Sequence, residues 1–278
     1  MKSNMNPKIS IITITYNSEK TLEETIKSVI SQEYDNLEYV IIDGGSRDGT
    51  LEIIDKYRDK IAVVVSEPDN GISDAFNKGL KIATGEIIGI INSDDLLMPG
   101  ALKAINDAYD PEVDVYRGEM IYKNIKTGFK FIGKPSMDCS VSNYIRLGVA
   151  HPSTFISKRA YQKVGGYKTH VRYIMDIDML FRLYNSGCPF KYVPQKLALF
   201  NSGGATDDHL YKKVLERYMV IRDNGGSLLL GLYVAITCFF KDIIKVILDF
   251  IGGENLKHRL MGRHNISSEV DGCFEDDK

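Results

Sequence analysis

The sequence predicts an α/β fold with a mostly parallel central sheet flanked by helices, followed by a C-terminal helical extension. Two observations lead to this prediction. The first hundred residues alternate β-branched runs with amphipathic stretches four times, which is the order of right-handed βαβ units. In addition, residues 87–91 (IIGII) are apolar except for Gly89, as expected of a strand covered by helices on both faces.

The alternation predicts each element of the first hundred residues. The predicted strands are residues 9–15, 37–42, 61–66 and 87–91, and the predicted helices are residues 21–32, 51–57 and 72–83. The first helix is predicted from an apolar stripe at i, i+4, i+7 and i+8, formed by Leu22, Ile26, Val29 and Ile30. Thr21 and Glu24, at its start, have the spacing of a capping box.

The pattern changes after Pro99. A helix at residues 101–109 is followed by a predicted strand pair, 113–124 and 129–134, with a turn between them. Further helices are predicted at residues 139–147, 159–164, 173–187 and 207–224, and residues 151–157 are a loop that leads into a strand. These elements follow the parallel half of the sheet.

Composition excludes several classes of protein. The 278 residues carry a net charge of −2, so no broad basic surface for nucleic acid is predicted. The four cysteines form no CxxC pair, which excludes a zinc cluster or disulfide framework and favours a reducing, cytosolic compartment. The N-terminal residues lack a signal-peptide core, and no run of 18 apolar residues is free of charge. We expect a catalytic domain at 1–205, a helical extension at 206–265 and a disordered acidic tail at 266–278.

Polar side chains follow every strand of the predicted parallel half. They are Thr15 and Tyr16, Asp43, Asp69 and Asn70, and Asp94 and Asp95. Ligands of such sheets bind at the carboxyl ends of the strands, so we expect these side chains to line a site. Two adjacent carboxylates repel each other unless a cation joins them, and a hard divalent cation often bridges carboxylates to a phosphate. The alternative is a turn and a helix cap before Pro99.

Five stretches, in order, give the chain a resemblance to the family 2 glycosyltransferases. They are ISIITITYN, YVIIDGGSRDGT, SEPDNGISDAFNKGLKIATGEIIGIINSDDLLMPG, HPSTFISKRAYQKVGGY and MDIDMLFRL, between residue 8 and about residue 200. The resemblance implies a GT-A (Rossmann-like) fold and an inverting transfer of a sugar from a nucleotide donor. The form DNGISDAFNKG, with HPSTF and GGAT, is similar to enzymes that build bacterial exopolysaccharide or lipopolysaccharide repeat units.

The resemblance also implies roles for single residues on the donor side. Asp43 accepts a hydrogen bond from the nucleobase, which favours a UDP-sugar, while Thr15 and Tyr16 lie against the base and ribose. Asp94 lies near the ribose, and Asp95 binds Mn²⁺ or Mg²⁺ on the donor pyrophosphate. The other implied donor-binding residues are Asp69 and Lys78, with Arg47 as a further candidate phosphate partner; a solvated face is the alternative for Lys78 and Arg47.

On the acceptor side, the resemblance implies that Asp176 is the general base. The chain departs from the family pattern in two places, because Asn92-Ser93-Asp94 replaces the usual Asp-x-Asp and Met175 precedes Asp176 where Glu is frequent. Asp178 is therefore interpreted as structural. His151 is a candidate metal or phosphate ligand, with a plain loop histidine as the alternative. His209, after residues 203–206 (GGAT), is the weaker candidate.

The C-terminal stretch 228–251 is strongly apolar, but Lys241, Asp242, Lys245 and Asp249 interrupt it. Its first half, 13 residues to position 240, is too short to span a bilayer as a helix. Two alternatives stay open: these helices pack on the catalytic domain or another subunit, or they lie in the membrane interface near a lipid-linked acceptor. A basic cluster would suit an anionic leaflet; it contains Lys257, His258, Arg259, Arg263 and His264.

The functional prediction is a metal-dependent hexosyltransferase (EC 2.4) of bacterial surface polysaccharide synthesis. Its partners are a nucleotide-sugar donor and a saccharide or lipid-linked saccharide acceptor, and nucleic acid is not among them. A sugar nucleotidyltransferase is one alternative, although Tyr16-Asn17-Ser18 stands where those enzymes carry a Gly-rich basic loop. The other is a non-catalytic nucleotide- or glycan-binding module. We expect a cytoplasmic protein, with the inner face of the cell membrane and a homo-oligomer as open alternatives.

Overall fold

The computed structural model describes residues 6–148, 151–202, 210–251 and 266. The strands are β1 (Ile9–Thr15), β2 (Leu37–Asp43), β3 (Val63–Ser66), β4 (Ile87–Asn92), β5 (Leu96–Leu97), β6 (Val115–Asn124), β7 (Lys130–Gly133), β8 (Thr154–Ser157) and β9 (Phe190–Ser202). They form one sheet in the order β3-β2-β1-β4-β8-β6-β9-β5, with β7 paired to β6. The first four strands run parallel, which confirms the predicted parallel half.

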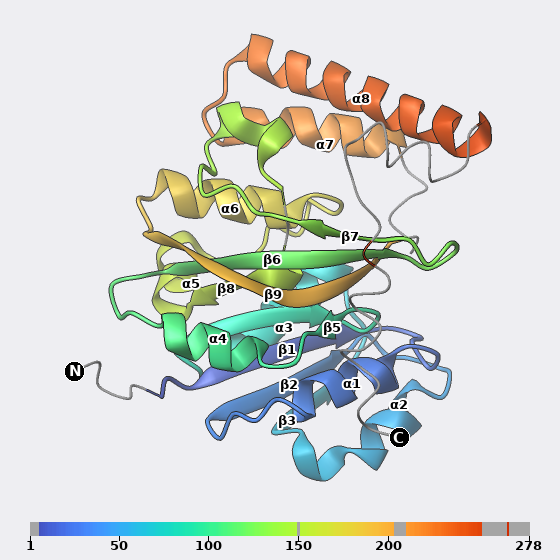
Figure 1. Ribbon diagram of the computed structural model, residues 1–278, viewed down its shortest axis with the longest axis vertical. Helices are drawn as coiled ribbons and strands as arrows, with labels where there is room; N and C mark the ends of the chain where they lie inside the picture. The colour runs from blue at the N-terminus through green and yellow to red at the C-terminus, as the bar shows by residue number, and fades with distance from the viewer. Residues whose placement is uncertain (1–5, 149–150, 203–209, 252–265, 267–278) are drawn as a thin grey trace.

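Helices lie on both faces of this sheet (Figure 1). They are α1 (Leu22–Ile30), α2 (Thr50–Lys56), α3 (Ile72–Ile82), α4 (Ala101–Ala108), α5 (Lys158–Val164), α6 (Met175–Asn185), α7 (Leu210–Asp223) and α8 (Leu228–Ile251). Three short 3₁₀ helices are η1 (Arg58–Lys60), η2 (Val141–Arg146) and η3 (His151–Ser153). Helix α1 starts as predicted, but its N-cap, Thr21, makes no side-chain cap hydrogen bond, so the predicted capping box is wrong.

Alternating side chains of each strand enter two separate cores. On β1, Ile12 packs with residues of α3, α5 and α6, whereas Ile9 and Ile11 pack with residues of α1, α2 and α4. Gly89 interrupts the apolar run of β4 because a Cβ there would lie 2.6 Å from the Phe155 ring of β8. The glycine therefore permits close packing between two neighbouring strands.

Strand β9 is the main element that the sequence analysis misses. It pairs parallel with β6 over its length, while β6 and β8 pair antiparallel, so the second half of the sheet is mixed. Pro194 lies within β9, and a proline in a candidate strand argues against the assignment from sequence alone. The structure accommodates it where the β6–β9 register shifts, around Glu119. Helix α8 is also continuous, not divided into two halves as predicted.

Glu38 fastens the start of the sheet. Its carboxylate accepts hydrogen bonds from Lys8 Nζ (2.7 Å), Ser10 Oγ (2.5 Å) and Thr84 N (2.6 Å). Burial by itself would raise the pKa of Glu38, but these hydrogen bonds outweigh it and lower the pKa to about 2. The ionised carboxylate is therefore bound more favourably in the folded chain than in the unfolded chain.

We expect Glu38→Gln to lower the free energy of unfolding by about 3 kcal/mol at about pH 7, from a shift of about two units. Because the folded-state pKa is depressed, this contribution is present above the unfolded-state pKa and is lost as the pH falls towards about 2. Urea unfolding of both proteins between neutral and acidic pH measures the difference. The exposed Glu33→Gln serves as the control; a difference that does not shrink with falling pH would contradict the assignment.

Candidate functional site

The carboxyl ends of β1, β2 and β4 meet at one edge of the sheet, and hydrogen bonds connect the loops that follow them. Gly44 N donates to Thr15 O (2.9 Å), which joins the ends of β2 and β1. The hydroxyls of Ser18 and Ser93 lie 2.8 Å apart, which joins the loops after β1 and β4. The predicted convergence of these polar segments is therefore present in the fold.

Asp94 and Asp95 follow β4 at this edge. Asp95 is fully buried; its Oδ1 accepts from Asn201 N and its Oδ2 from Asn92 Nδ2, both at 3.2 Å. Burial, and then the charge of Asp94, raise the pKa of Asp95 well above its ordinary value. Burial also raises the pKa of Asp94, against the opposing charge of His151. Among the causes that act on the described residues, only His151 opposes the burial of this pair with a positive charge, and it acts on Asp94.

Several buried acceptor atoms near this pair make no hydrogen bond in the structure. Asn92 Oδ1, Asn201 Oδ1 and His151 Nε2 are among them. Within the described ranges, no three His, Cys, Asp or Glu side chains are grouped as a complete metal cage. Magnesium sites often use one or two carboxylates together with substrate phosphates, so two carboxylates with free amide and imidazole acceptors fit a divalent cation here.

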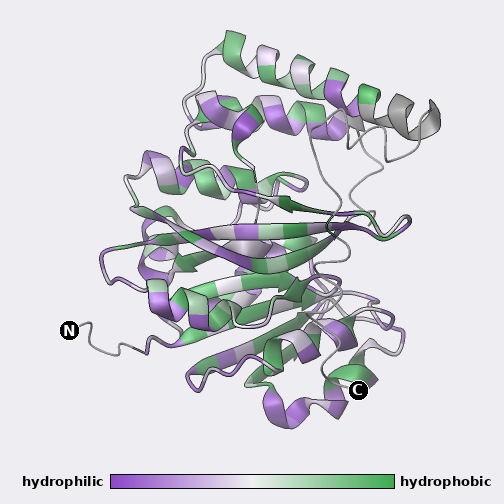
Figure 2. Cartoon of the chain, in the orientation of Figure 1, coloured by the Kyte–Doolittle hydropathy of each residue, from purple (hydrophilic) through white to green (hydrophobic). Residues whose placement is uncertain are grey.

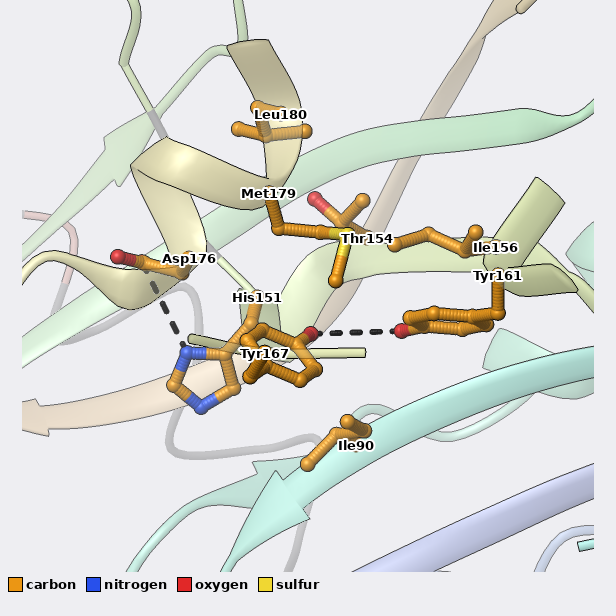
Figure 3. Close-up of a pocket in the computed structure, with 9 residues that line it drawn as sticks. All are labelled: Ile90, His151, Thr154, Ile156, Tyr161, Tyr167, Asp176, Met179 and Leu180. Atoms are coloured by element: carbon orange, nitrogen blue, oxygen red, sulfur yellow. Dashed lines mark hydrogen bonds and ion pairs between the residues drawn. The ribbon is translucent and has the colours of Figure 1, made fainter. Parts of the chain in front are cut away.

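His151 and Asp176 lie next to each other in the lining of the pocket drawn in Figure 3. His151 Nδ1 in η3 lies 3.8 Å from Asp176 Oδ2 at the start of α6, too long for a hydrogen bond but close enough for an ion pair. The imidazole also packs edge-on against Phe76 of α3, with ring centroids 5.4 Å apart. Asp176 Oδ1 accepts from Ile177 N (2.9 Å), which fixes the carboxylate at the helix N-terminus.

The structure distinguishes Asp43 from Asp69. Asp43 is fully buried, and its carboxylate accepts from Gly45 N (3.1 Å), Ser46 N (3.0 Å), Ser66 Oγ (2.6 Å) and Ser46 Oγ. These bonds shape the turn after β2. Asp69, by contrast, uses Oδ1 to accept from Gly71 N (2.8 Å).

Asp69 Oδ2 is directed towards Gly44, because a Cβ on Gly44 would lie 2.5 Å from that oxygen. The same Cβ would lie 3.4 Å from the ring of Tyr16, whose side chain is largely exposed. An aromatic ring, a glycine and a carboxylate therefore meet on the exposed side of this edge. Thr15 Oγ1, immediately before Tyr16, is buried and makes no hydrogen bond.

Lys78, on α3, is bonded to the loop that precedes this helix. Its Nζ donates to Pro68 O (2.8 Å) and pairs with Glu67 (2.9 Å), and the hydrogen bond to Glu67 raises the pKa of Lys78. The lysine thereby holds the loop that carries Asp69. Arg47 is exposed in the turn after β2. His209 and residues 203–206 lie outside the described residues.

Asp178 has structural partners. Its fully buried carboxylate accepts from Lys168 Nζ (2.9 Å), Arg182 Nε (2.8 Å) and Asn224 Nδ2 (2.9 Å). These bonds outweigh burial and lower the pKa of Asp178. They connect α6 to the preceding loop and to the segment after α7, which supports the structural interpretation.

Sequence reasoning missed two residues of the site. Asn201, near the end of β9, donates its backbone N–H to Asp95 and its amide to the backbone carbonyl of Asp94. Arg117 is fully buried in β6, and its Nη1 donates to Cys139 Sγ (3.1 Å). Burial lowers the pKa of Arg117, against the opposing effects of Cys139 and of the charge of Asp176. An arginine within the apolar pattern VDVYRGEMIY was the available signal for Arg117.

Comparisons with known proteins identify the family and the fold of the chain. A family model described as Glycosyl transferase family 2 matches residues 10–173. The putative glycosyltransferase EpsE of Bacillus subtilis (strain 168) is 28% identical over 199 residues, which are 66% of this chain and 69% of that protein.

Two solved structures share the fold. S. aureus TarS 1-349 in complex with UDP-GlcNAc matches with a TM-score of 0.62 and 20% identity, over 78% of this chain and 66% of that chain. This chain therefore spans just under two thirds of that protein. Mannosyltransferase PcManGT from Pyrobaculum calidifontis, in complex with GDP-Man and Mn²⁺, matches with a TM-score of 0.61 and 18% identity, over 98% and 82% of the two chains.

Proposed function

Because the chain belongs to glycosyltransferase family 2 and has the GT-A fold, we propose that it transfers a sugar with inversion from a nucleotide-sugar donor, a UDP-sugar being favoured. The acceptor is a hydroxyl of a glycan or of a lipid-linked saccharide in bacterial surface polysaccharide synthesis. One observation carries the proposal: His151 acts electrostatically on Asp94, the neighbour of the buried Asp95, and its Nδ1 lies 3.8 Å from Asp176 Oδ2. An acidic donor side and a separate base are what such a transfer requires.

The acceptor hydroxyl attacks the anomeric carbon as the bond to the donor diphosphate breaks. Asp176 accepts the hydroxyl proton, and attack opposite the leaving diphosphate inverts the anomeric centre. Asp95, His151 Nε2 and Asn201 Oδ1 are the atoms that would hold Mn²⁺ or Mg²⁺, and Asp94 lies towards the ribose. A bound cation would neutralise charge on the departing diphosphate. Each Asp95 oxygen keeps a second lone pair beside its existing hydrogen bond.

For the nucleobase, the contacts favour Asp69 over Asp43. The Asp43 carboxylate accepts four hydrogen bonds from its own turn and from β3, whereas Asp69 Oδ2 stands beside Tyr16. We assign stacking on the base to Tyr16 and acceptance of the base N–H to Asp69. Lys78 then acts by holding the loop, and contact with phosphate is not needed for that role.

Thermal unfolding with UDP, GDP, dTDP or CMP, with and without Mn²⁺, tests this proposal. We expect UDP with Mn²⁺ at about 100 times its dissociation constant to stabilise the protein by about 2.7 kcal/mol. Asp69→Ala should remove most of that stabilisation, because the imide N–H of the base loses its acceptor. Asp107→Ala, at an exposed position of α4, should retain it. The absence of a shift with every nucleotide contradicts the transferase proposal. A full shift in Asp69→Ala contradicts the assignment of the base contact.

The remaining parts of the proposal concern location. We propose a catalytic domain at residues 1–205, a helical extension at 206–265 and an acidic tail at 266–278. The enzyme would act in the cytoplasm at the inner face of the cell membrane, where a lipid-linked acceptor is presented. Among the described residues, no helix has the length and apolar character needed to cross a membrane.

A further inference from the structure

Helices α7 and α8 lie side by side beyond α6, with α8 outermost (Figure 1). We propose that α8, flanked by α7, is a docking surface for an anionic lipid bilayer and lies flat in its interface. This inference deepens the proposed function, and rests on it for the lipid-linked acceptor alone. The surface itself is argued from exposure, packing and charge, and it is measured without any sugar transfer.

The outward face of α8 is apolar throughout its described side chains. Exposed side chains on it are Leu228, Leu229, Leu232, Tyr233, Ile236, Phe239, Phe240 and Ile244. At 100° per residue they fall within an arc of about 160° that contains no polar or charged residue between positions 228 and 244. Leu229 is 77% exposed and Phe240 57%. In Figure 2, α8 lies along the outer edge of the molecule and carries several segments coloured as hydrophobic.

The opposite face of α8 holds the helix on the protein. Val234 and Ala235 are buried, and Asp242 accepts a hydrogen bond from Arg217 Nη1 of α7 at 2.8 Å. At Gly231, an added Cβ would lie 2.9 Å from the Tyr218 ring of α7, so the two helices approach closely. The helix thus directs an acidic side chain inward and its large apolar side chains outward. Exposed apolar patches of this kind mark binding surfaces for protein or membrane.

The charges at the border of this face favour an anionic bilayer over a second copy. Among the described side chains of α7 and α8, the exposed charged residues are Lys212, Arg222, Asp223 and Lys241. Asp223 lies 3.5 Å from Lys168, so the remaining three leave the border basic. A symmetric dimer through this face would bring like charges together, whereas anionic headgroups would attract them.

Aromatic residues add to the same argument. Tyr211 on α7 is 65% exposed and Tyr233 on α8 is 59% exposed. Tyrosine is enriched at membrane interfaces, because its ring is apolar and its hydroxyl reaches water. On α7, Tyr211, Leu215 and Met219 form an exposed row at i, i+4 and i+8. A helix that packs on the protein with one face and turns its large apolar side chains outward is the arrangement expected of a protein that lies on a membrane without crossing it.

The docking helices are connected directly to the proposed base. Glu216 of α7 accepts hydrogen bonds from the backbone N–H groups of Arg172 and Tyr173, both at 2.8 Å. These residues lie just before α6, and Asp176 is the second residue of that helix. Glu216 is also the neighbour of Arg217, which holds α8. A bilayer bound on α8 would therefore stand in a fixed relation to the group that receives the acceptor proton.

Flotation of the full-length protein with vesicles tests the proposal. We expect binding to mixed phosphatidylglycerol–phosphatidylcholine vesicles at low salt and much weaker binding to phosphatidylcholine alone. Ile236→Glu is expected to lower partitioning about tenfold or more, because it removes a large apolar contact and adds a negative charge. Ile125→Glu is the matched control, since Ile125 is 54% exposed on the β6–β7 turn and Ile236 is 53% exposed.

Three results would overturn the inference. The first is wild-type protein that stays in the lipid-free fraction with anionic vesicles, and the second is Ile236→Glu that floats as well as Ile125→Glu. The third is a stable dimer in lipid-free solution that Ile236→Glu dissociates, measured by sedimentation, because a second copy would then cover the face. A cooperative thermal unfolding transition, measured on the same samples with and without UDP, confirms that each variant is folded. It also separates failure of docking from failure of the transferase proposal.

Discussion

Asp176→Asn is expected to lower the rate of sugar transfer by at least about 10²–10⁴-fold, the usual range for loss of a general base. An amide nitrogen cannot accept the proton of the acceptor hydroxyl, whereas the amide oxygen can still accept the hydrogen bond from Ile177 N. The start of α6 should therefore keep its structure. Release of nucleoside diphosphate, in the presence of a lipid-linked saccharide fraction as acceptor, measures the rate.

Donor binding provides the internal control for this variant. The thermal stabilisation by nucleotide and Mn²⁺ should match that of the wild type, because Asp176 is assigned to the acceptor side and not to the donor. Asp107→Asn, on the exposed side of α4, should retain both transfer and binding. Turnover near the wild-type rate in Asp176→Asn would contradict the assignment of Asp176 as the general base.

Asp95→Asn is expected to abolish stabilisation by Mn²⁺ and to slow transfer by about 10²–10³-fold, since a cation on the leaving group contributes several kcal/mol. The substitution removes one of two adjacent carboxyl groups while keeping the shape of the side chain. The Asn92 amide can then turn over, so that its free Oδ1 accepts from the new amide N–H. In metal-free buffer the variant should unfold at the same temperature as the wild type or above it.

Calorimetry or thermal unfolding with and without Mn²⁺ checks both parts of this expectation. Asp110→Asn, in the turn that follows the C-terminal end of α4, is the control. It should respond to Mn²⁺ as the wild type does. Destabilisation of metal-free Asp95→Asn would indicate that Asp95 is needed for folding in its charged form. A retained response to Mn²⁺ in that variant would show that residues other than Asp95 bind the metal.

The parallel half of the fold was predictable because its signals are local. Each strand from β1 to β4 is a β-branched run of a few residues, and each intervening helix has its own apolar stripe. Strand β9 was not predictable in this way. Its Pro194 argues against a strand, and it forms only because β6 supplies a partner whose register shifts beside that proline.

The candidate site divides along the same line. Its acidic residues at strand ends, the Asp94–Asp95 pair and the candidate base could be selected from the sequence, because residue type and order carry that information. Whether these side chains are accessible to a ligand could not be predicted from the sequence. Asn201 reaches Asp95 from more than a hundred residues away, and Arg117 is buried beside Cys139, where the charge of Asp176 acts on it.

The sequence by itself determined the alternation of strands and helices, the family and the set of acidic residues from which we propose that the transferase site is built. Only the tertiary structure decided which carboxylates are available to bind a ligand. The carboxylates of Asp43 and Asp178 accept several hydrogen bonds from the protein, whereas Asp69 bonds its own turn through Oδ1 and directs Oδ2 towards Gly44. The tertiary structure also decided that α8 turns its apolar face outward. The physical reason is the same in each case, since burial and hydrogen-bond partners depend on segments that are distant in the chain and adjacent only after folding.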